Sequence, residues 1–192
     1  YKIILEPFKK NTAPAILSSV LIEDISNKQP IIFFSADHLI QKNKIFNNAI
    51  IKNKKNLNNE NIFIFGTKPN SPSSQYGYFL TKKISQKVNK VVKFIEKPNT
   101  ILAKKIIRKK GYWNSGILFA RKDSIINNFD KYQSKILRLC IESIFKSKIH
   151  NNVFYLDHKS FKKIPEISFD YAILEKSKNI NGIKLNIPWS DL

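Results

Sequence analysis

The chain is short of several residue types, and it has no long apolar segment. Its 192 residues include one cysteine, no methionine and five glycines. The single cysteine, Cys140, excludes a disulfide framework within these residues and fits a reducing compartment, so we expect a cytoplasmic protein. Its apolar helical setting indicates packing rather than nucleophilic catalysis. No apolar run approaches the roughly 18 residues of a membrane-spanning helix, so we expect no membrane partner.

Arginine is also scarce, although the chain is strongly basic. The formal net charge is +20, but only three of the 34 basic residues are arginines, which leaves 31 lysines. Lysine lacks the bidentate fork that sequence-specific nucleic-acid recognition favours. In residues 101–110 the basic side chains fall mostly opposite the apolar ones on a helix, as on a solvated face. We therefore expect no specific nucleic-acid partner, although a non-enzymatic basic protein is an alternative, and the charge would attract anionic substrates.

What the chain does contain is an alternation of apolar strands and helical patterns. It predicts one three-layer α/β domain over residues 1–192, since no linker or internal repeat divides it. Strands are predicted at Lys2–Leu5, Ile31–Phe34, Ile62–Phe65, Tyr76–Thr81, Val91–Glu96, Ile117–Arg121 and Ile183–Ile187. Helices are predicted at 11–25, Phe46–Leu57, Ile101–Lys110, Ser124–Phe145 (as one helix or two) and Asp170–Lys176.

Two aspartates follow predicted strands, at the edge where α/β sheets bind ligands. Asp37 comes after Ile31–Phe34, and Asp191 comes after the last predicted strand. Carboxylates at such positions suit Mg²⁺, a hard cation that takes oxygen ligands and bridges phosphates. The alternative is that each aspartate forms a turn or caps a helix. His38 shares no metal-ligand spacing with the other histidines and is interpreted as structural.

The segment from Glu6 to Ala15 is a polar loop that leads into a helix. Asn11 and Thr12 offer amide and hydroxyl groups beside exposed N–H donors, which could read a purine edge or a ribose hydroxyl. On spacing alone, an ordinary helix N-cap is favoured instead.

Further polar residues stand at the ends of strands and helices. Glu96 could accept hydroxyl groups, and Lys97 could pair with a phosphate oxygen. Gly77 would let the backbone approach a ligand closely, or it would form a bulge in a strand. Asp170 could accept a hydroxyl group or cap the helix that it opens.

Seven short segments occur in one order along the chain. They are Leu5-Glu6-Pro7-Phe8-Lys9-Lys10-Asn11-Thr12-Ala13-Pro14-Ala15, Ser35-Ala36-Asp37-His38, Tyr76-Gly77-Tyr78, Phe94-Ile95-Glu96-Lys97-Pro98, Trp113-Asn114-Ser115-Gly116, Ser168-Phe169-Asp170-Tyr171-Ala172 and Trp189-Ser190-Asp191. Together they resemble the bacterial mannose-1-phosphate guanylyltransferases, and the resemblance covers nearly the whole chain. It implies a Rossmann-like nucleotidyltransferase fold of the GT-A type with a mixed central sheet. It also implies transfer of GMP from GTP to mannose 1-phosphate, which gives GDP-mannose and pyrophosphate.

The resemblance also implies roles for individual residues. Asp37 and Asp191 would hold Mg²⁺ and, with Lys97, carry catalysis. Contacts with the nucleotide are implied for Glu6, Pro7, Lys10, Asn11, Thr12 and Ala13. Contacts with mannose and its phosphate are implied for Gly77, Tyr78, Glu96, Asn114 and Asp170, whereas Trp113 is expected to pack rather than to stack on a ligand.

The chain departs from the family pattern at both subsites. Lys10 stands where the family usually has arginine, and Ser73-Ser74-Gln75 replaces Glu-Thr-Gly before Tyr76. These changes leave open another base or another hexose 1-phosphate, and the oligomeric state is open too.

A Gly-rich phosphate loop, with which the family begins, is missing from the sequence. The resemblance therefore implies a partial nucleotidyltransferase domain, truncated at both ends. Without the first strand, two apolar strands should lack a shared neighbour, so we predict that these residues alone are inactive and poorly stable. The alternative is a decayed or split pseudoenzyme that binds sugar nucleotide without turnover.

Overall fold

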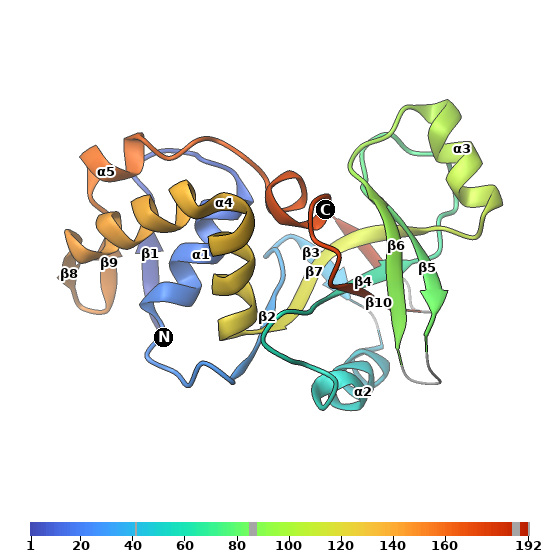
Figure 1. Cartoon of the computed structure of the whole chain (residues 1–192), viewed down its shortest axis with the longest axis horizontal. Coiled ribbons are helices and arrows are strands. Elements are labelled where there is room, and N and C mark those ends of the chain that lie inside the picture. The colour runs from blue at the N-terminus through green and yellow to red at the C-terminus, as the bar shows by residue number, and fades with distance from the viewer. Residues whose placement is uncertain (41, 85–87, 186–188, 192) are drawn as a thin grey trace.

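The computed structural model describes residues 1–40, 42–84, 88–185 and 189–191 (Figure 1). The helices are α1 (Thr12–Ile22), α2 (Asn43–Lys54), α3 (Thr100–Arg108), α4 (Lys122–Phe145), α5 (His158–Lys162) and the short π-helix η1 (Asp170–Leu174). The strands are β1 (Ile3–Leu5), β2 (Pro30–Phe33), β3 (His38–Ile40), β4 (Ile62–Thr67), β5 (Tyr78–Lys83), β6 (Asn89–Ile95), β7 (Tyr112–Arg121), β8 (Lys148–His150), β9 (Val153–Tyr155), β10 (Ile180–Leu185) and β11 (Trp189–Asp191).

Six of these strands form one central sheet in the order β2-β7-β4-β10-β6-β5. Strand β10 runs parallel to β4, and the other neighbours run antiparallel. All six residues of β4 are buried, which fits the continuous apolar run of an interior strand. The first residues of β7 also pair with β5, so the long strand β7 contacts three others. The sheet is therefore mixed, as expected.

Helices cover both faces of this sheet, which makes the domain three-layered (Figure 1). On one face, α1 and α4 pack against side chains such as Ile64 of β4 and Leu118 of β7. On the other face, Phe46 of α2 packs with Phe65 of β4 and Phe119 of β7. The expected three-layer α/β architecture is confirmed.

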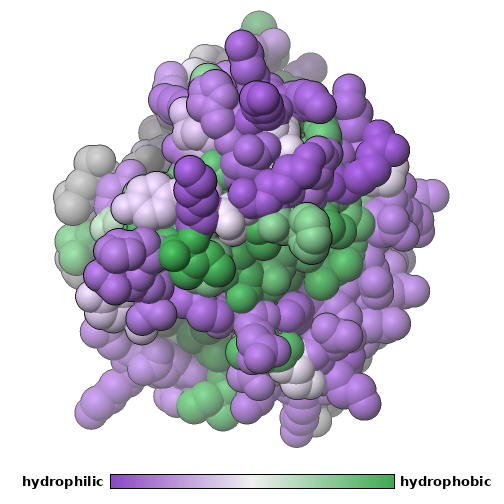
Figure 2. Space-filling view, turned by 90° about the vertical axis from the view of Figure 1, so that its left-hand side faces the viewer, coloured by the Kyte–Doolittle hydropathy of each residue, from purple (hydrophilic) through white to green (hydrophobic). Residues whose placement is uncertain are grey.

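A second, three-stranded sheet lies beside α4 and α5, in the order β1-β9-β8. Large apolar side chains of this sheet are exposed, and Figure 2 shows an apolar band across that side of the molecule. They include Ile3, Leu5, Ile149 and Tyr155. Strand β1 ends this sheet and β2 ends the central sheet, so within the described residues both strands have an unpaired edge. Every open sheet has two such edges, so the expectation that two apolar strands lack a shared neighbour stays a prediction.

Several predicted boundaries are wrong by a few residues. Helix α1 ends at Ile22 rather than residue 25, and α2 begins and ends three residues earlier than predicted. Strand β7 begins at Tyr112, five residues before the predicted start, because its polar first half pairs with β4 and β5. The last predicted strand, Ile183–Ile187, is observed as Ile180–Leu185; residues 186 and 187 lie outside the described part, as do residues 85–87 between β5 and β6.

The long helix α4 is interrupted at one residue, so it consists of two helical parts. Its Gln133 has a non-helical backbone, with φ −148° and ψ 44°. The Gln133 amide donates a hydrogen bond of 3.1 Å to the carbonyl oxygen of Ala172 in η1. This hydrogen bond connects the break in α4 to η1, the helix that begins with Asp170.

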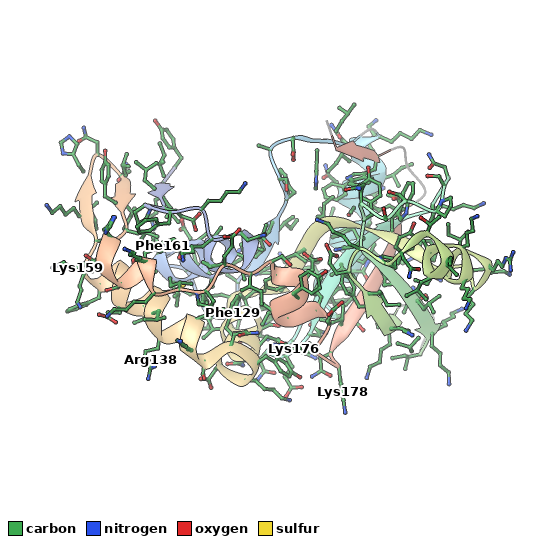
Figure 3. All side chains as sticks on the ribbon, turned by 90° about the horizontal axis from the view of Figure 1, so that it is seen from above. Phe129, Arg138, Lys159, Phe161, Lys176 and Lys178 are labelled. Atoms are coloured by element: carbon green, nitrogen blue, oxygen red, sulfur yellow. The ribbon has the colours of Figure 1, made fainter. Side chains whose placement is uncertain are left out.

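The basic residues lie largely outside the core. Figure 3 shows Arg138, Lys159, Lys176 and Lys178 projecting outward, while the buried rings of Phe129 and Phe161 lie inside. Within the described residues, no helix is both long and apolar enough to span a membrane.

Candidate functional site

Two adjoining openings lie beside β3, β7 and η1. The first, here called the β2 groove, has a volume of about 460 Å³ and lies between α1 and β2. The second, here called the small opening, has a volume of about 140 Å³ and lies beside Gly77 and Asn114. Three residues line both: His38, Gly116 and Asp170. A ligand that occupied both openings would therefore pass these three residues.

The small opening gathers four of the five residues for which sugar contacts were expected. They are Gly77, Glu96, Asn114 and Asp170. Asn114 lies on β7, where its backbone N–H donates to the carbonyl oxygen of Gly77 at 2.7 Å. Its side-chain amide donates to Oδ1 of Asp170 at 2.8 Å. Hydrogen bonds thus hold β7, the strand start at Gly77 and η1 in one arrangement.

Gly77 permits a close approach that other residues would prevent. A Cβ atom at this position would collide with Oε2 of Glu96 and would lie 3.2 Å from the ring of Phe94. Glycine is therefore required for the Glu96 carboxylate to stand where it does.

Two carboxyl groups in the small opening have raised pKa values. Burial, the neighbouring Asp170 and, more weakly, Glu175 raise the pKa of Glu96 to about 7, against the opposing effect of Lys97. Burial raises the pKa of Asp170 to about 6, while the Asn114 hydrogen bond and Lys97 act to lower it. Such paired carboxyl groups are characteristic of functional sites.

Lys97 and Glu175 complete the surroundings of these carboxyl groups. Lys97 is exposed and has a left-handed backbone with φ 43°, and its charge acts on both Glu96 and Asp170. Oε1 of Glu175 accepts a hydrogen bond of 3.1 Å from the backbone N–H of Glu96. The end of β6 is therefore attached to the segment that follows η1.

Tyr78 is the exception among the expected sugar contacts. Its side chain is fully buried, and its hydroxyl donates a 2.8 Å hydrogen bond to the carbonyl oxygen of Ser73. This residue anchors the loop before β5, so its side chain is not available to a ligand. The strand alternation that turns Gly77 toward the opening turns Tyr78 into the core.

The expected metal ligands are brought together by strands that the sequence did not predict. Asp191 lies in β11 rather than in the turn after a sheet strand, and β11 pairs antiparallel with β3. Asp191 is the partner of His38, which directly follows Asp37. The Asp37 side chain is 60% exposed. The pairing places the backbone of Asp191 beside that of His38, and Mg²⁺ binding by the two aspartates stays a prediction.

No larger metal-binding cluster accompanies them. The described residues contain no group of three or more His, Cys, Asp and Glu side chains that could hold a metal ion.

The expected nucleotide contacts mostly have structural partners. Oδ1 of Asn11 caps α1 through a 2.8 Å hydrogen bond from the Thr12 N–H, and Ala13 is buried. The Thr12 hydroxyl accepts from the N–H of Phe169 at 2.9 Å. Thr12 nevertheless lines the β2 groove, and it is the only one of the six expected residues that does.

The three other expected nucleotide contacts lie in the loop between β1 and α1. Nζ of Lys10 donates to the carbonyl oxygen of Lys162 at the end of α5, at 3.1 Å. Pro7 is exposed. Glu6 has one carboxylate oxygen buried with no hydrogen-bond partner among the described residues, and burial raises the pKa of this group. The alternative that this segment forms an ordinary helix N-cap is correct for Asn11, whose side chain caps α1.

Some lining residues were not assigned a role from the sequence. His38 was interpreted as structural, and Gly116 and Trp189 were noted only as parts of motifs. Gly116 has φ 73°, a conformation that favours glycine. The Trp189 ring meets the His38 ring edge-on at 5.5 Å. The positive φ could not be read from the sequence, and the ring contact depends on the β3–β11 pairing.

Comparison with known proteins identifies the family. The family described as Nucleotidyl transferase matches residues 1–192, which is the whole chain. A mannose-1-phosphate guanylyltransferase from Escherichia coli is 34% identical over 199 residues, which cover 99% of this chain and 43% of that protein. The alginate biosynthesis protein AlgA of Pseudomonas aeruginosa is 27% identical over 195 residues, covering 99% of this chain and 40% of AlgA. The chain thus spans about two fifths of the length of these curated relatives.

Solved structures show the same fold. A Helicobacter pylori protein described as mannose-6-phosphate isomerase superimposes with a TM-score of 0.86 at 28% identity, covering 99% of this chain and 74% of that one. A Thermus thermophilus protein described as mannose-1-phosphate geranyltransferase gives a TM-score of 0.83 at 22% identity, covering 97% and 53%. The predicted Rossmann-like nucleotidyltransferase fold is confirmed.

Proposed function

Because the chain belongs to the nucleotidyl transferase family, we propose that it transfers GMP from GTP to mannose 1-phosphate, giving GDP-mannose and pyrophosphate. The observation that carries the proposal is the small opening, where Glu96, Asn114 and Asp170 meet beside Lys97. Carboxylates and an amide suit the hydroxyl groups of a sugar, and a lysine suits its phosphate. The naming of relatives as mannose-1-phosphate guanylyltransferases supports this choice of substrates.

In the proposed reaction, a phosphate oxygen of mannose 1-phosphate attacks the α-phosphorus of GTP. The bond from that phosphorus to the bridging oxygen of the β-phosphate breaks, and pyrophosphate leaves in line. Such a reaction needs positioning and charge stabilisation rather than a protein nucleophile. This fits a chain whose single cysteine is buried, with its pKa raised to about 12 by burial.

The two substrates would divide between the two openings. The small opening would hold mannose, with Lys97 on its phosphate, and the β2 groove would hold part of the nucleotide near Thr12. Asp37 and Asp191 would hold Mg²⁺, which when bound would offset the negative charges of the phosphates. His38, Gly116 and Asp170 line both openings, so the reacting phosphates would meet beside them.

The proposal is tested by pyrophosphate release with Mg²⁺, mannose 1-phosphate and each nucleoside triphosphate in turn. The assay uses the chain alone and the chain joined to a segment with the Gly-rich loop that the sequence resemblance implies. We expect GTP-selective release only with the added segment. Asp37→Asn or Asp191→Asn should lower the rate by at least about a hundredfold, because each removes charge that would hold the ion.

The control is Asp130→Asn, which neutralises an exposed aspartate on α4 and should leave the rate unchanged. Release that prefers another triphosphate or another hexose 1-phosphate would correct the substrate assignment. A cooperatively folded protein without release for any nucleotide would favour the pseudoenzyme.

A further inference from the structure

His38 lies where the two openings join. It lines both the β2 groove and the small opening. It lies on β3 opposite Asp191 and directly after Asp37, so both expected metal ligands flank it. Its side chain is only 8% exposed.

The imidazole ring has two close neighbours. The Trp189 ring packs against it edge-on, with centroids 5.5 Å apart and planes at 78°. A Cβ atom at Gly116 would lie 3.2 Å from Cε1 and 3.8 Å from Nε2 of His38. The absence of a side chain at Gly116 thus leaves room for the Cε1–Nε2 edge, and Gly116 itself lines both openings.

The two ring nitrogens differ in their surroundings. Nδ1 is buried and has no hydrogen-bond partner among the described residues. A buried donor without a partner is rarer in proteins than a buried acceptor without one, which favours placing the proton of the neutral ring on Nε2. Nε2 lies 3.9 Å from Oδ1 of Asp37, beyond hydrogen-bond distance. Nε2 is therefore assigned as the donor, and it lies on the ring edge beside Gly116, which lines both openings.

We propose that His38 is a substrate-binding residue whose Nε2–H donates a hydrogen bond to a phosphate oxygen at the junction of the two openings. The assignment of that oxygen to the reacting phosphates rests on the proposed function. A hydrogen bond to a charged oxygen strengthens binding roughly tenfold or more. This role in substrate binding is distinct from the packing of the ring against its neighbours.

Three substitutions separate binding from packing. His38→Leu replaces the ring with an apolar side chain of similar length, which cannot donate the hydrogen bond. His38→Gln places an amide near the position of Nε2, whereas His38→Asn places one near Nδ1. We expect kcat/KM for mannose 1-phosphate to fall roughly tenfold in the Leu and Asn variants and to recover in the Gln variant. The exposed His158→Asn is the matched control, with no change expected.

A second measurement does not depend on turnover. The chain has three histidines, so a long-range ¹H–¹⁵N spectrum contains His150 and His158 as internal references. At constant pH and without metal, mannose 1-phosphate or inorganic pyrophosphate should shift the Nε2 resonance of His38 and leave the other two rings unchanged.

The outcomes separate this inference from the proposed function. A shift of His38 Nε2 in a protein that releases no pyrophosphate even when joined to the added segment would support the inference and count against the proposed reaction. An unshifted His38 resonance, or full activity in the Leu variant of a protein that releases pyrophosphate, would overturn the inference and leave the proposed reaction standing.

Discussion

The two openings that meet at His38 are built in different ways. The small opening is lined by polar groups that already bind one another, since Asn114 donates to Asp170 and its backbone binds Gly77. The β2 groove is lined mainly by apolar side chains such as Ile16 and Phe33, beside a strand whose outer edge is unpaired among the described residues. The first geometry is fixed by sheet register within the described residues. The second has one wall formed by a strand that is paired on one side only among the described residues.

The largest effect should come from breaking the polar contacts of the small opening. Asn114→Ala removes the amide that donates to the half-buried carboxyl group of Asp170. We expect the free energy of unfolding to fall by about 2 kcal/mol, because a half-buried charged acceptor loses its partner. The pKa of Asp170 should rise above about 6, since this hydrogen bond lowers it.

Urea denaturation and NMR titration of the carboxyl carbon measure these two effects. Asn53→Ala is the comparison, because Asn53 is similarly buried but makes only a local hydrogen bond to Ala49 within α2. A loss no greater than the roughly 1 kcal/mol expected there would contradict the view that the small opening is held by Asn114.

Gly77→Ala tests the close approach of backbone and carboxylate in the same opening. The added methyl group would displace the flexible end of the Glu96 side chain, so we expect a small cost in stability and a clear loss of mannose 1-phosphate binding. Calorimetric titration measures the binding. Ser134→Ala, at an exposed position on α4, should leave it unchanged. Unimpaired binding in the glycine variant would show that Glu96 does not need its observed position.

The raised pKa of Glu96 predicts how stability depends on pH. A carboxyl group with a folded-state pKa of about 7, above its ordinary 4.5, binds more protons in the folded state between these values. Its contribution to stability is therefore greatest below pH 4.5 and is lost as the pH rises through about 7. Urea midpoints measured at intervals across this range and just above it should decline, and Glu96→Gln should flatten this decline. An identical slope in both proteins would refute the assignment.

The smallest effect is expected beside the β2 groove. Asn11 caps α1 and has a left-handed backbone with φ 67°. Asn11→Ala should cost about 1 kcal/mol through loss of the cap, whereas Asn11→Gly should cost only a few tenths because glycine tolerates this conformation. Thermal unfolding of the two variants measures the difference. Equal losses would mean that the cap contributes little here.

The long strands and helices were more predictable than the three-residue strands. The long apolar strands and α4 were predictable, because burial on both faces leaves a continuous apolar run and a helix face repeats regularly. Strands β3, β8, β9 and β11 were missed, since three residues carry no pattern and their pairing is decided by the tertiary fold.

The candidate site was predictable as a set of residues but not as an arrangement. The motifs named Gly77, Glu96, Asn114 and Asp170, and the structure brings them together at one opening. The direction of each side chain depended on register, so Tyr78 was assigned to a ligand although it faces the core. The role of His38 was invisible for a related reason, because it depends on Gly116 and Trp189 from distant parts of the chain.

Strand β7 connects nearly everything described above. It pairs with β2, β4 and β5, and it carries both Asn114 and Gly116. Its later residues alternate between the two layers, with Ile117 and Phe119 toward α2 and Leu118 and Ala120 toward α1 and α4. One additional codon in this stretch would exchange these faces, because side chains in a strand alternate with a period of two. In a library of single-residue insertions, β7 should therefore be the most depleted segment, and the exposed loop around Ser74 among the most permissive.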